Sequence, residues 1–221
     1  MRRRPPAPLP HAWTRYACLD LVNSRWTDHL GSGEVHDRLP LPEWRAAFLD
    51  RWGLRPLEGP GEPGVAELAA LRSLLRRLLE AFARRQALPA TDVEALNRVL
   101  ARSPLTRRLE PAEGDAGTAP PRAGGHRLLE APARRGREWA LAEIAASAAR
   151  LLAEGDPARL RICANPACSW MFYDESRNGS RRWCQGAVCG SLVKVRRFRA
   201  RGPARAGRGA RRGASSSDPD P

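Results

Sequence analysis

Four of the five cysteines of this chain form two close pairs near its C-terminal end. They are Cys163 and Cys168, then Cys184 and Cys189, in the spacing C-x4-C-x15-C-x4-C. Two pairs on two turns, joined by a short insert, supply the four thiolates of a closed tetrahedral zinc site. Such a site has no open position for a substrate, so we expect one structural zinc ion whose binding energy folds the segment. Two disulfides, or four free thiols, are the alternative interpretations.

The insert between the two pairs has the composition of a small β-hairpin. Trp170–Tyr173 is expected to be a strand, Asn178-Gly179 a tight turn, and Arg181–Trp183 the returning strand. Three aromatic side chains are expected to pack the small core that the metal completes: Trp170, Phe172 and Trp183.

Basic residues surround this cluster and extend beyond it. Ser191 is placed to cap a helix over Leu192–Arg201, with Leu192, Val195 and Phe198 on one side. A basic hairpin and a basic helix are suited to a phosphate backbone. The expected nucleic-acid contacts are Arg177, Arg181, Arg182, Lys194, Arg196, Arg197, Arg199 and Arg201. A solvated charged surface is the alternative interpretation.

Net charge separates this end of the chain from the rest. The formal net charge is +14, and residues 161–213 carry 13 Lys and Arg against 2 acids, whereas residues 1–160 have a net charge of only +5. A polyanion is therefore the expected partner, with nucleic acid as the first candidate and an anionic membrane surface as the second. Only one of the 38 basic residues is a lysine, which is typical of a GC-rich bacterial genome, so part of the arginine excess reflects composition.

The elements that must position this module are mostly helical. Apolar periodicity predicts helices over Leu41–Trp52, Val65–Ala87 and Arg137–Ala153, with Gly53 ending the first. Thr91 and Glu94 form the pattern of a capping box for a further helix that runs to Leu100. Short strands are expected over Leu105–Glu110 and His126–Ala131, joined by the loop Pro111–Gly125, and Cys18 is expected in the core.

The expected fold class is α+β: a mostly helical N-terminal domain with a small β element, then a four-cysteine module with a hairpin and a basic helix. We place the N-terminal domain at residues 13–155 and the module at 158–201. Disordered tails are expected over residues 1–12 and over the Arg/Gly-rich residues 202–221.

The cysteine-rich segment resembles the CGNR-type zinc finger. The resemblance is carried by Phe172, Asp174, Ser176-Arg177-Asn178, Ser180–Cys184 and Cys189-Gly190. Residues 16–153 look like the bacterial ABATE domain that precedes this finger, and Tyr16–Ser24 matches the characteristic start of that domain with Leu19, Asp20 and Asn23. The resemblance implies a DNA-binding, stress-induced transcription regulator in which the four paired cysteines hold zinc and the arginines contact DNA.

One position departs from the family pattern. Where the family name motif reads Cys-Gly-Asn-Arg, this chain has Cys189-Gly190 followed by Ser191 and Leu192. Serine keeps a capping residue, but leucine removes a cation and a five-donor fork. If the family arginine touches DNA, affinity is weakened here; if it braces the finger, the packing is rearranged.

The residues show no catalytic set, so we expect no enzyme: glycine-rich phosphate loops, G-x-S-x-G and H-E-x-x-H are all missing from the sequence. Asp20 and Asn23 either line a ligand pocket or cap and turn the chain. No apolar run has signal-peptide or membrane-spanning length, and we expect a cytoplasmic protein. The alternatives to a DNA-binding regulator are an RNA-binding module, with Tyr173 stacking on bases, and a small-molecule binder with a purely structural finger.

Overall fold

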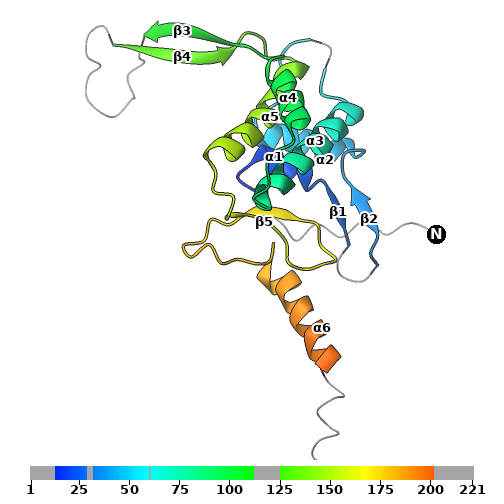
Figure 1. The fold of residues 1–221 in the computed structure, drawn as a ribbon. Helices are drawn as coiled ribbons and strands as arrows, with labels where there is room; N and C mark the ends of the chain where they lie inside the picture. The colour runs from blue at the N-terminus through cyan, green and yellow to red at the C-terminus, as the bar shows by residue number, and fades with distance from the viewer. Residues whose placement is uncertain (1–12, 29–31, 60, 112–124, 202–221) are drawn as a thin grey trace, which may run out of the picture.

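The computed structural model of the chain describes residues 13–28, 32–59, 61–111 and 125–201. Its first part contains helices and two strand pairs (Figure 1). These elements are α1 (Ala17–Val22), β1 (Arg25–Thr27), β2 (Val35–Asp37), α2 (Pro42–Arg51), α3 (Val65–Ala83), α4 (Ala90–Leu100), β3 (Leu105–Pro111), β4 (His126–Pro132) and α5 (Arg137–Glu154). The second part contains β5 (Leu160–Ile162), β6 (Met171–Tyr173), the π-helical turn η1 (Gly186–Gly190) and α6 (Ser191–Arg201). The expected class, a mostly helical domain followed by a small cysteine module, is confirmed.

Helix α1 lies at the centre of the N-terminal core. All six of its residues are buried, and it packs against both α3 and α5. The thiol of Cys18 is fully buried there, so this cysteine is a core residue as predicted, and burial raises its pKa to about 12. A neutral thiol in an apolar core behaves as a small hydrophobic side chain.

Helix α3 supplies the widest apolar face of the core. Leu68, Leu75, Leu78 and Leu79 are fully buried. The N–H of Gly64 donates to a carboxylate oxygen of Glu67 at 2.8 Å, which satisfies one of the free donors at the start of this helix.

The end of α3 lies four residues before the predicted end at Ala87. Arg85 has a φ of +56°, in the left-handed region. The N–H of Arg85 donates to Phe82 O, and the N–H of Gln86 donates to Ala81 O. These two bonds form a Schellman motif, which turns the chain toward α4 before the apolar pattern has ended.

Helix α4 does not use the capping box that the sequence predicts. It begins at Ala90 with Pro89 as its N-cap residue, and no side chain caps it. Thr91 therefore already lies inside the helix, and the N–H groups of Asp92 and Val93 both donate to the carbonyl of Pro89. The fixed φ of Pro89 sets the start of the helix, and the prediction that Thr91 and Glu94 form a capping box there was wrong.

Strands β3 and β4 form an arm that projects from the helices (Figure 1). The two predicted strands are confirmed and pair antiparallel, with Leu109 opposite Leu128 and Arg107 opposite Glu130. Leu105, Leu109 and Leu128 are exposed. The predicted loop Pro111–Gly125 lies almost entirely outside the described residues.

The two parts of the chain exchange residues across their boundary. Leu160 of β5 and Met171 of β6 belong to the apolar core of the helical part, and β5 contacts α3. In return Trp26 of β1 belongs to the cluster around the cysteines. Beyond this seam, α6 projects away from the body on the side opposite the β3–β4 arm (Figure 1).

Candidate metal centre

The two cysteine pairs lie on two different turns. In the first turn the N–H of Cys163 donates to Trp170 O at 2.9 Å, and the N–H of Cys168 donates to Asn165 O at 2.8 Å. In the second, Cys184 precedes η1 and Cys189 lies within it. The N–H of Cys184 approaches the Cys163 sulfur at 3.5 Å, so the second turn is seated on the first.

The four sulfur atoms lie within 4.8 Å of one another, and all four cysteines are buried. Cys168 and Cys184 are 3.8 Å apart and Cys184 and Cys189 3.6 Å apart, measured between sulfurs. Zinc–sulfur bonds of about 2.3 Å in a tetrahedron place the sulfurs about 3.8 Å apart. No disulfide joins any of these four cysteines, and their spacing fits one tetrahedral zinc ion.

The ionisation of the cluster also favours a cation. Donation from the thiols of Cys168 and Cys184 lowers the pKa of Cys163 to about 2. The hydrogen bond that Cys168 donates to Cys163 raises the pKa of Cys168 to about 12. The hydrogen bond that Cys184 donates to Cys163 raises the pKa of Cys184 in the same way. The pKa of Cys189 is raised by burial. Four negative sulfurs at this separation would repel one another. A divalent ion would supply the charge that lets all four ionise.

Asn165 connects the metal centre to α6. Its side chain is fully buried, and its amide nitrogen points at the Cys189 sulfur at 3.6 Å. The amide oxygen accepts from the Ala167 N–H at 3.2 Å and from Arg196 Nη1 at 3.4 Å. The sequence prediction missed this residue, although Asn165-Pro166 between two cysteines is a turn signal.

The predicted hairpin partner of the 170–173 strand was wrong. Strand β6 pairs with β5, with Arg161 opposite Phe172, and residues 181–183 form no strand. The reason is Asp174, whose fully buried carboxylate accepts from the Ser176 N–H, the Ser176 hydroxyl and the Arg181 N–H. Burial would raise the pKa of Asp174, but these bonds outweigh it and hold the pKa below its ordinary value. They fold the segment after β6 into a loop.

Aromatic rings cover the cysteines, as predicted for Trp170, Phe172 and Trp183. Gly190 lies against the last of these rings, because a Cβ at this position would come within 3.1 Å of Trp183 Cδ1. A larger residue after the fourth cysteine would therefore require the Trp183 ring to shift by a few tenths of an ångström from η1.

Three of the eight predicted nucleic-acid contacts have partners inside the finger. The Arg181 guanidinium lies 4.7 Å from the Phe172 ring centroid and donates to the carbonyls of Trp183 and Cys184. The guanidinium of Arg182 lies 5.5 Å from the Trp183 centroid, and Arg196 reaches Asn165. Arg181 and Arg196 thus support the metal centre, a role that charge and spacing did not reveal.

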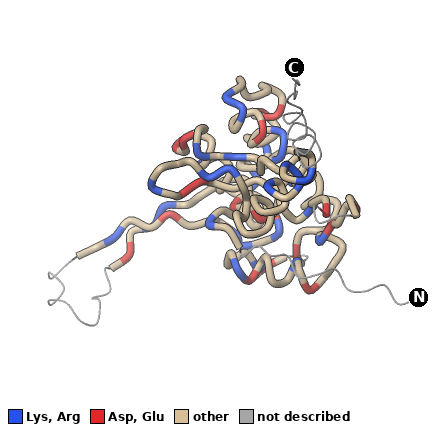
Figure 2. The backbone as a smooth tube through the Cα atoms, turned by 90° about the horizontal axis from the view of Figure 1, so that it is seen from below, with Lys and Arg blue, Asp and Glu red and all other residues tan. Residues whose placement is uncertain are grey.

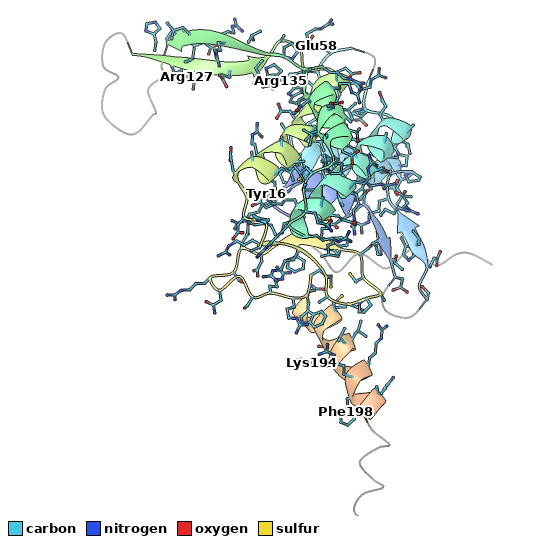
Figure 3. All side chains as sticks on the ribbon, in the orientation of Figure 1. Tyr16, Glu58, Arg127, Arg135, Lys194 and Phe198 are labelled. Carbon is cyan, nitrogen blue, oxygen red and sulfur yellow. The ribbon has the colours of Figure 1, made fainter. Side chains whose placement is uncertain are left out.

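The other predicted cations are exposed. Arg177, Lys194, Arg197 and Arg199 have no hydrogen bond or ion pair with any residue that the structure describes. Figure 3 labels Lys194 on α6, beyond the body, and Figure 2 views the molecule from that side with Lys and Arg in blue. Arg201 ends α6, and its side chain lies outside the described part of the chain.

The start of α6 differs from the sequence expectation. Ser191 has helical backbone angles and directly follows η1, so it is the first residue of a continuing helix and not its cap. Val193 on α6 is buried, at 7% exposure, whereas Val195 and Phe198 are exposed. The apolar side predicted from Leu192, Val195 and Phe198 therefore does not form a packed face.

Asp20 and Asn23 have partners within the protein. The Asp20 carboxylate accepts from the Thr14 N–H at 2.8 Å and from Trp52 Nε1 at 3.1 Å. Asn23 exchanges two hydrogen bonds with the backbone of Met171, at 2.8 and 2.9 Å. These contacts favour the interpretation that the pair turns the chain, and they show that Asn23 also joins the helical part to β6.

Comparison with family models places both parts of the chain. Residues 16–155 match the ABATE model, described as "Putative stress-induced transcription regulator", and residues 159–202 match the CGNR zinc finger. The chain belongs to the ABATE family. A search of curated proteins finds no match. Neither family model is that of an enzyme, and within the described residues no helix of the ABATE protein is long and apolar enough to cross a bilayer.

Proposed function

We propose that this ABATE protein is a zinc-dependent DNA-binding transcription regulator. In this proposal Cys163, Cys168, Cys184 and Cys189 ligate the ion, the CGNR finger contacts phosphates, and the ABATE domain senses a ligand or mediates assembly. The observation that carries the proposal is a projecting basic helix anchored on a buried four-sulfur cluster.

The free cations of the finger support contact with a polyanion. Lys194 and Arg197 lie three residues apart on α6, and Arg199 lies two residues after Arg197. Their side chains are exposed and have no partner in the described residues. An α-helix fits the major groove of B-DNA, and cations on its sides reach the phosphates that border the groove.

The metal centre supports zinc-dependent binding. The Asn165 amide touches both the Cys189 sulfur and Arg196 of α6. Loss of the metal would release the second cysteine turn, from which α6 continues without a break. The position of the basic helix therefore depends on an intact four-sulfur site.

Duplex DNA is favoured over single-stranded RNA by the state of Tyr173. The RNA alternative needs this ring free to stack on bases. Its centroid lies 5.4 Å from that of Tyr16, and its hydroxyl accepts from the Asp156 N–H at 3.0 Å. The ring is thus engaged within the protein.

Selection on random duplex DNA with the zinc-loaded chain, at about 0.15 M salt, tests the proposal. Enrichment of a defined site that disappears with a chelator supports a sequence-specific regulator. Salt titration of Lys194→Gln/Arg197→Gln should lower the slope of log affinity against log salt by about 2. The matched control is Arg108→Gln/Arg127→Gln, which removes two exposed cations from the β3–β4 arm. Equal loss in both variants, or binding that survives the chelator, contradicts a contact through the finger.

Restoring the family arginine probes the departure at Leu192. This side chain is half-buried on the first turn of α6. Because a guanidinium adds a cation next to Lys194, Leu192→Arg should raise duplex affinity by about tenfold if the position faces phosphate. Fluorescence anisotropy with a fixed duplex measures this, and Leu192→Met is the control of similar size. Unchanged affinity assigns the position to packing.

A further inference from the structure

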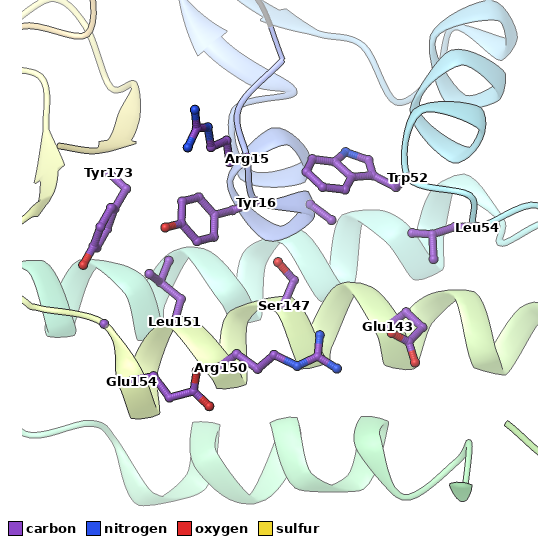
Figure 4. Close-up of a pocket in the computed structure, with 12 residues that line it drawn as sticks. Arg15, Tyr16, Trp52, Leu54, Glu143, Ser147, Arg150, Leu151, Glu154 and Tyr173 are labelled. Carbon is purple, nitrogen blue, oxygen red and sulfur yellow. The ribbon is translucent and has the colours of Figure 1, made fainter. Parts of the chain in front are cut away.

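The seam between the ABATE domain and the finger contains a cavity of about 510 Å³. The segment before α1, the end of α2, one face of α5 and the end of β6 line it (Figure 4). This volume lies within the range of small-molecule sites. Residues from both parts of the chain meet here, although neither cysteines nor the exposed cations of α6 take part.

One wall of the cavity is a polar stripe on α5. Glu143, Ser147, Arg150 and Glu154 recur at spacings of four, three and four residues, which places them on one face of the helix. Glu143, Arg150 and Glu154 form no ion pair or hydrogen bond with any residue in the described ranges. The stripe thus presents one cation between two carboxylates, all three without partners.

The opposite wall is aromatic. Figure 4 shows Tyr173, Tyr16 and Trp52 in a row across from the α5 stripe. Two of the rings are held in place, because Trp52 Nε1 donates to Asp20 and the Tyr173 hydroxyl accepts from the Asp156 N–H. The Tyr16 hydroxyl makes no hydrogen bond with any of the described residues and is a further free polar group. Rings fixed before a ligand arrives lose little entropy on binding.

A second hollow of about 380 Å³ shares Arg15, Tyr16 and Tyr173 with the first. It extends along the seam to Trp170 and Arg181 of the finger. Arg15 is paired with Glu175 at 3.3 Å, so Arg150 remains the cation without a partner among the described residues that line the first cavity.

We propose that the seam cavity binds a small aromatic zwitterion, with a planar ring, an ammonium and a carboxylate on one molecule. The ring would lie on the aromatic wall, the carboxylate would bond to Arg150, and the ammonium to Glu154 or Glu143. Arg150 and Glu154 are separated by about 6 Å along the helix axis, which suits the two charges of an α-amino acid. Phosphates and other polyanions would face two carboxylates, and an apolar ligand would cover three ions without bonding to them.

The inference deepens the sensing role proposed above and rests on that proposal for its biological meaning. Tyr173 directly precedes Asp174, whose carboxylate organises the loop to Arg181. A ligand against Tyr173 would therefore contact the residue next to the loop that supports the metal turn. In this way the seam cavity connects the ABATE domain to the finger.

Calorimetric titration of the zinc-loaded full chain tests the site without DNA. The probes are L-tryptophan, L-tyrosine and L-phenylalanine, with tryptamine and indole-3-propionate as analogues that each lack one charge. We expect saturable binding of at least one amino acid below about 1 mM and a loss of about tenfold or more for each analogue of L-tryptophan. No saturable binding of any of the three, or equal affinity for L-tryptophan and both analogues, overturns the proposal.

Two variants assign the charges. Arg150→Gln and Glu154→Gln should each weaken binding of the amino acid by about tenfold, since each removes one charge-assisted bond. Arg98→Gln removes an exposed arginine from α4 and should leave binding unchanged. Unchanged binding in both cavity variants contradicts the site. Amino-acid binding by a chain that selects no DNA would sink the regulator proposal and leave the cavity assignment intact.

Discussion

The ABATE domain and the finger are held together by two different kinds of core. The first has a large apolar cluster that includes Phe48, Leu75 and Ile144, all fully buried. The second has four cysteines among its seven buried members, and its other members are Trp26, Trp170 and Phe172. The hydrophobic effect stabilises the first region, whereas in the second the apolar core is small and zinc binding would supply the folding free energy. Cysteine therefore has a different role in each region: Cys18 packs as an apolar side chain in the first, and the four paired cysteines are the proposed metal ligands in the second.

Replacing one cysteine in each region should give the largest difference between the two cores. Cys184→Ser removes one ligand, and we expect the zinc content to fall from one ion per chain to none and the finger to unfold, because structural zinc contributes about 10–16 kcal/mol of apparent binding free energy. Metal analysis and near-UV circular dichroism of the finger tryptophans measure this.

Cys18→Ser is the matched control in the ABATE core. It buries a hydroxyl in place of a thiol and should lower the free energy of unfolding by about 1–3 kcal/mol, with zinc content unchanged. Loss of zinc from Cys18→Ser, or a folded finger in Cys184→Ser, would contradict the contrast between the two cores.

A buried carboxylate in each region gives the next comparison. Asp174→Asn keeps the shape but loses the charge that accepts from Ser176 and from the Arg181 N–H. We expect the finger to lose about 3 kcal/mol of stability while the ABATE helices melt unchanged. Asp92, paired with Arg77 at 2.7 Å, is the control carboxylate in the ABATE domain. Hydrogen exchange of the residues in 159–200 should rise for Asp174→Asn and stay constant for Asp92→Asn.

The seam between the two regions can be weakened without touching either core. Asn23→Ala removes both hydrogen bonds to the Met171 backbone, leaving a buried N–H and C=O without partners. We expect the free energy of unfolding to fall by about 2 kcal/mol, because β6 is released from α1. The ABATE domain and the finger should then unfold in two separate transitions. Differential scanning calorimetry would show it. A single transition of unchanged midpoint would mean that the apolar contacts of Leu160 and Met171 suffice.

Acid should lower the stability of the ABATE domain by breaking an ion pair that does not depend on the metal. We expect this effect to be smaller than those above. Arg72 donates to both carboxylate oxygens of Asp37 at 2.7 Å. Burial would raise the pKa of Asp37, but these bonds hold it below the ordinary value of 3.8. A lowered carboxyl pKa contributes stability that is present above pH 3.8 and is lost as the pH falls through the folded value.

The melting temperature of the chain, compared with that of Asp37→Asn, measures this contribution. We expect a constant difference of about 1 kcal/mol between pH 5 and pH 7, because the carboxylate is a third exposed, and a shrinking difference below about pH 4. A difference that persists unchanged at pH 2 would exclude ionisation of Asp37 as its source.

The sequence determined the features that depend on near neighbours. The helix periods of α2, α3 and α5, the strands β3 and β4 and the zinc-type spacing were all predicted correctly, since each is set within about 30 residues. Cysteine spacing also predicted the four-sulfur cluster, because two short turns and one insert leave few other arrangements.

Tertiary structure decided what joins distant segments. Asn23 and Met171 are 148 residues apart in the chain, and no periodicity in the sequence predicts their two hydrogen bonds. The pairing of β6 with β5, the entry of Trp26 into the cysteine cluster and the seam cavity depend in the same way on how the ABATE domain packs on the finger. Local patterns fix which residues are buried, but only packing of the whole chain selects the partners that they meet.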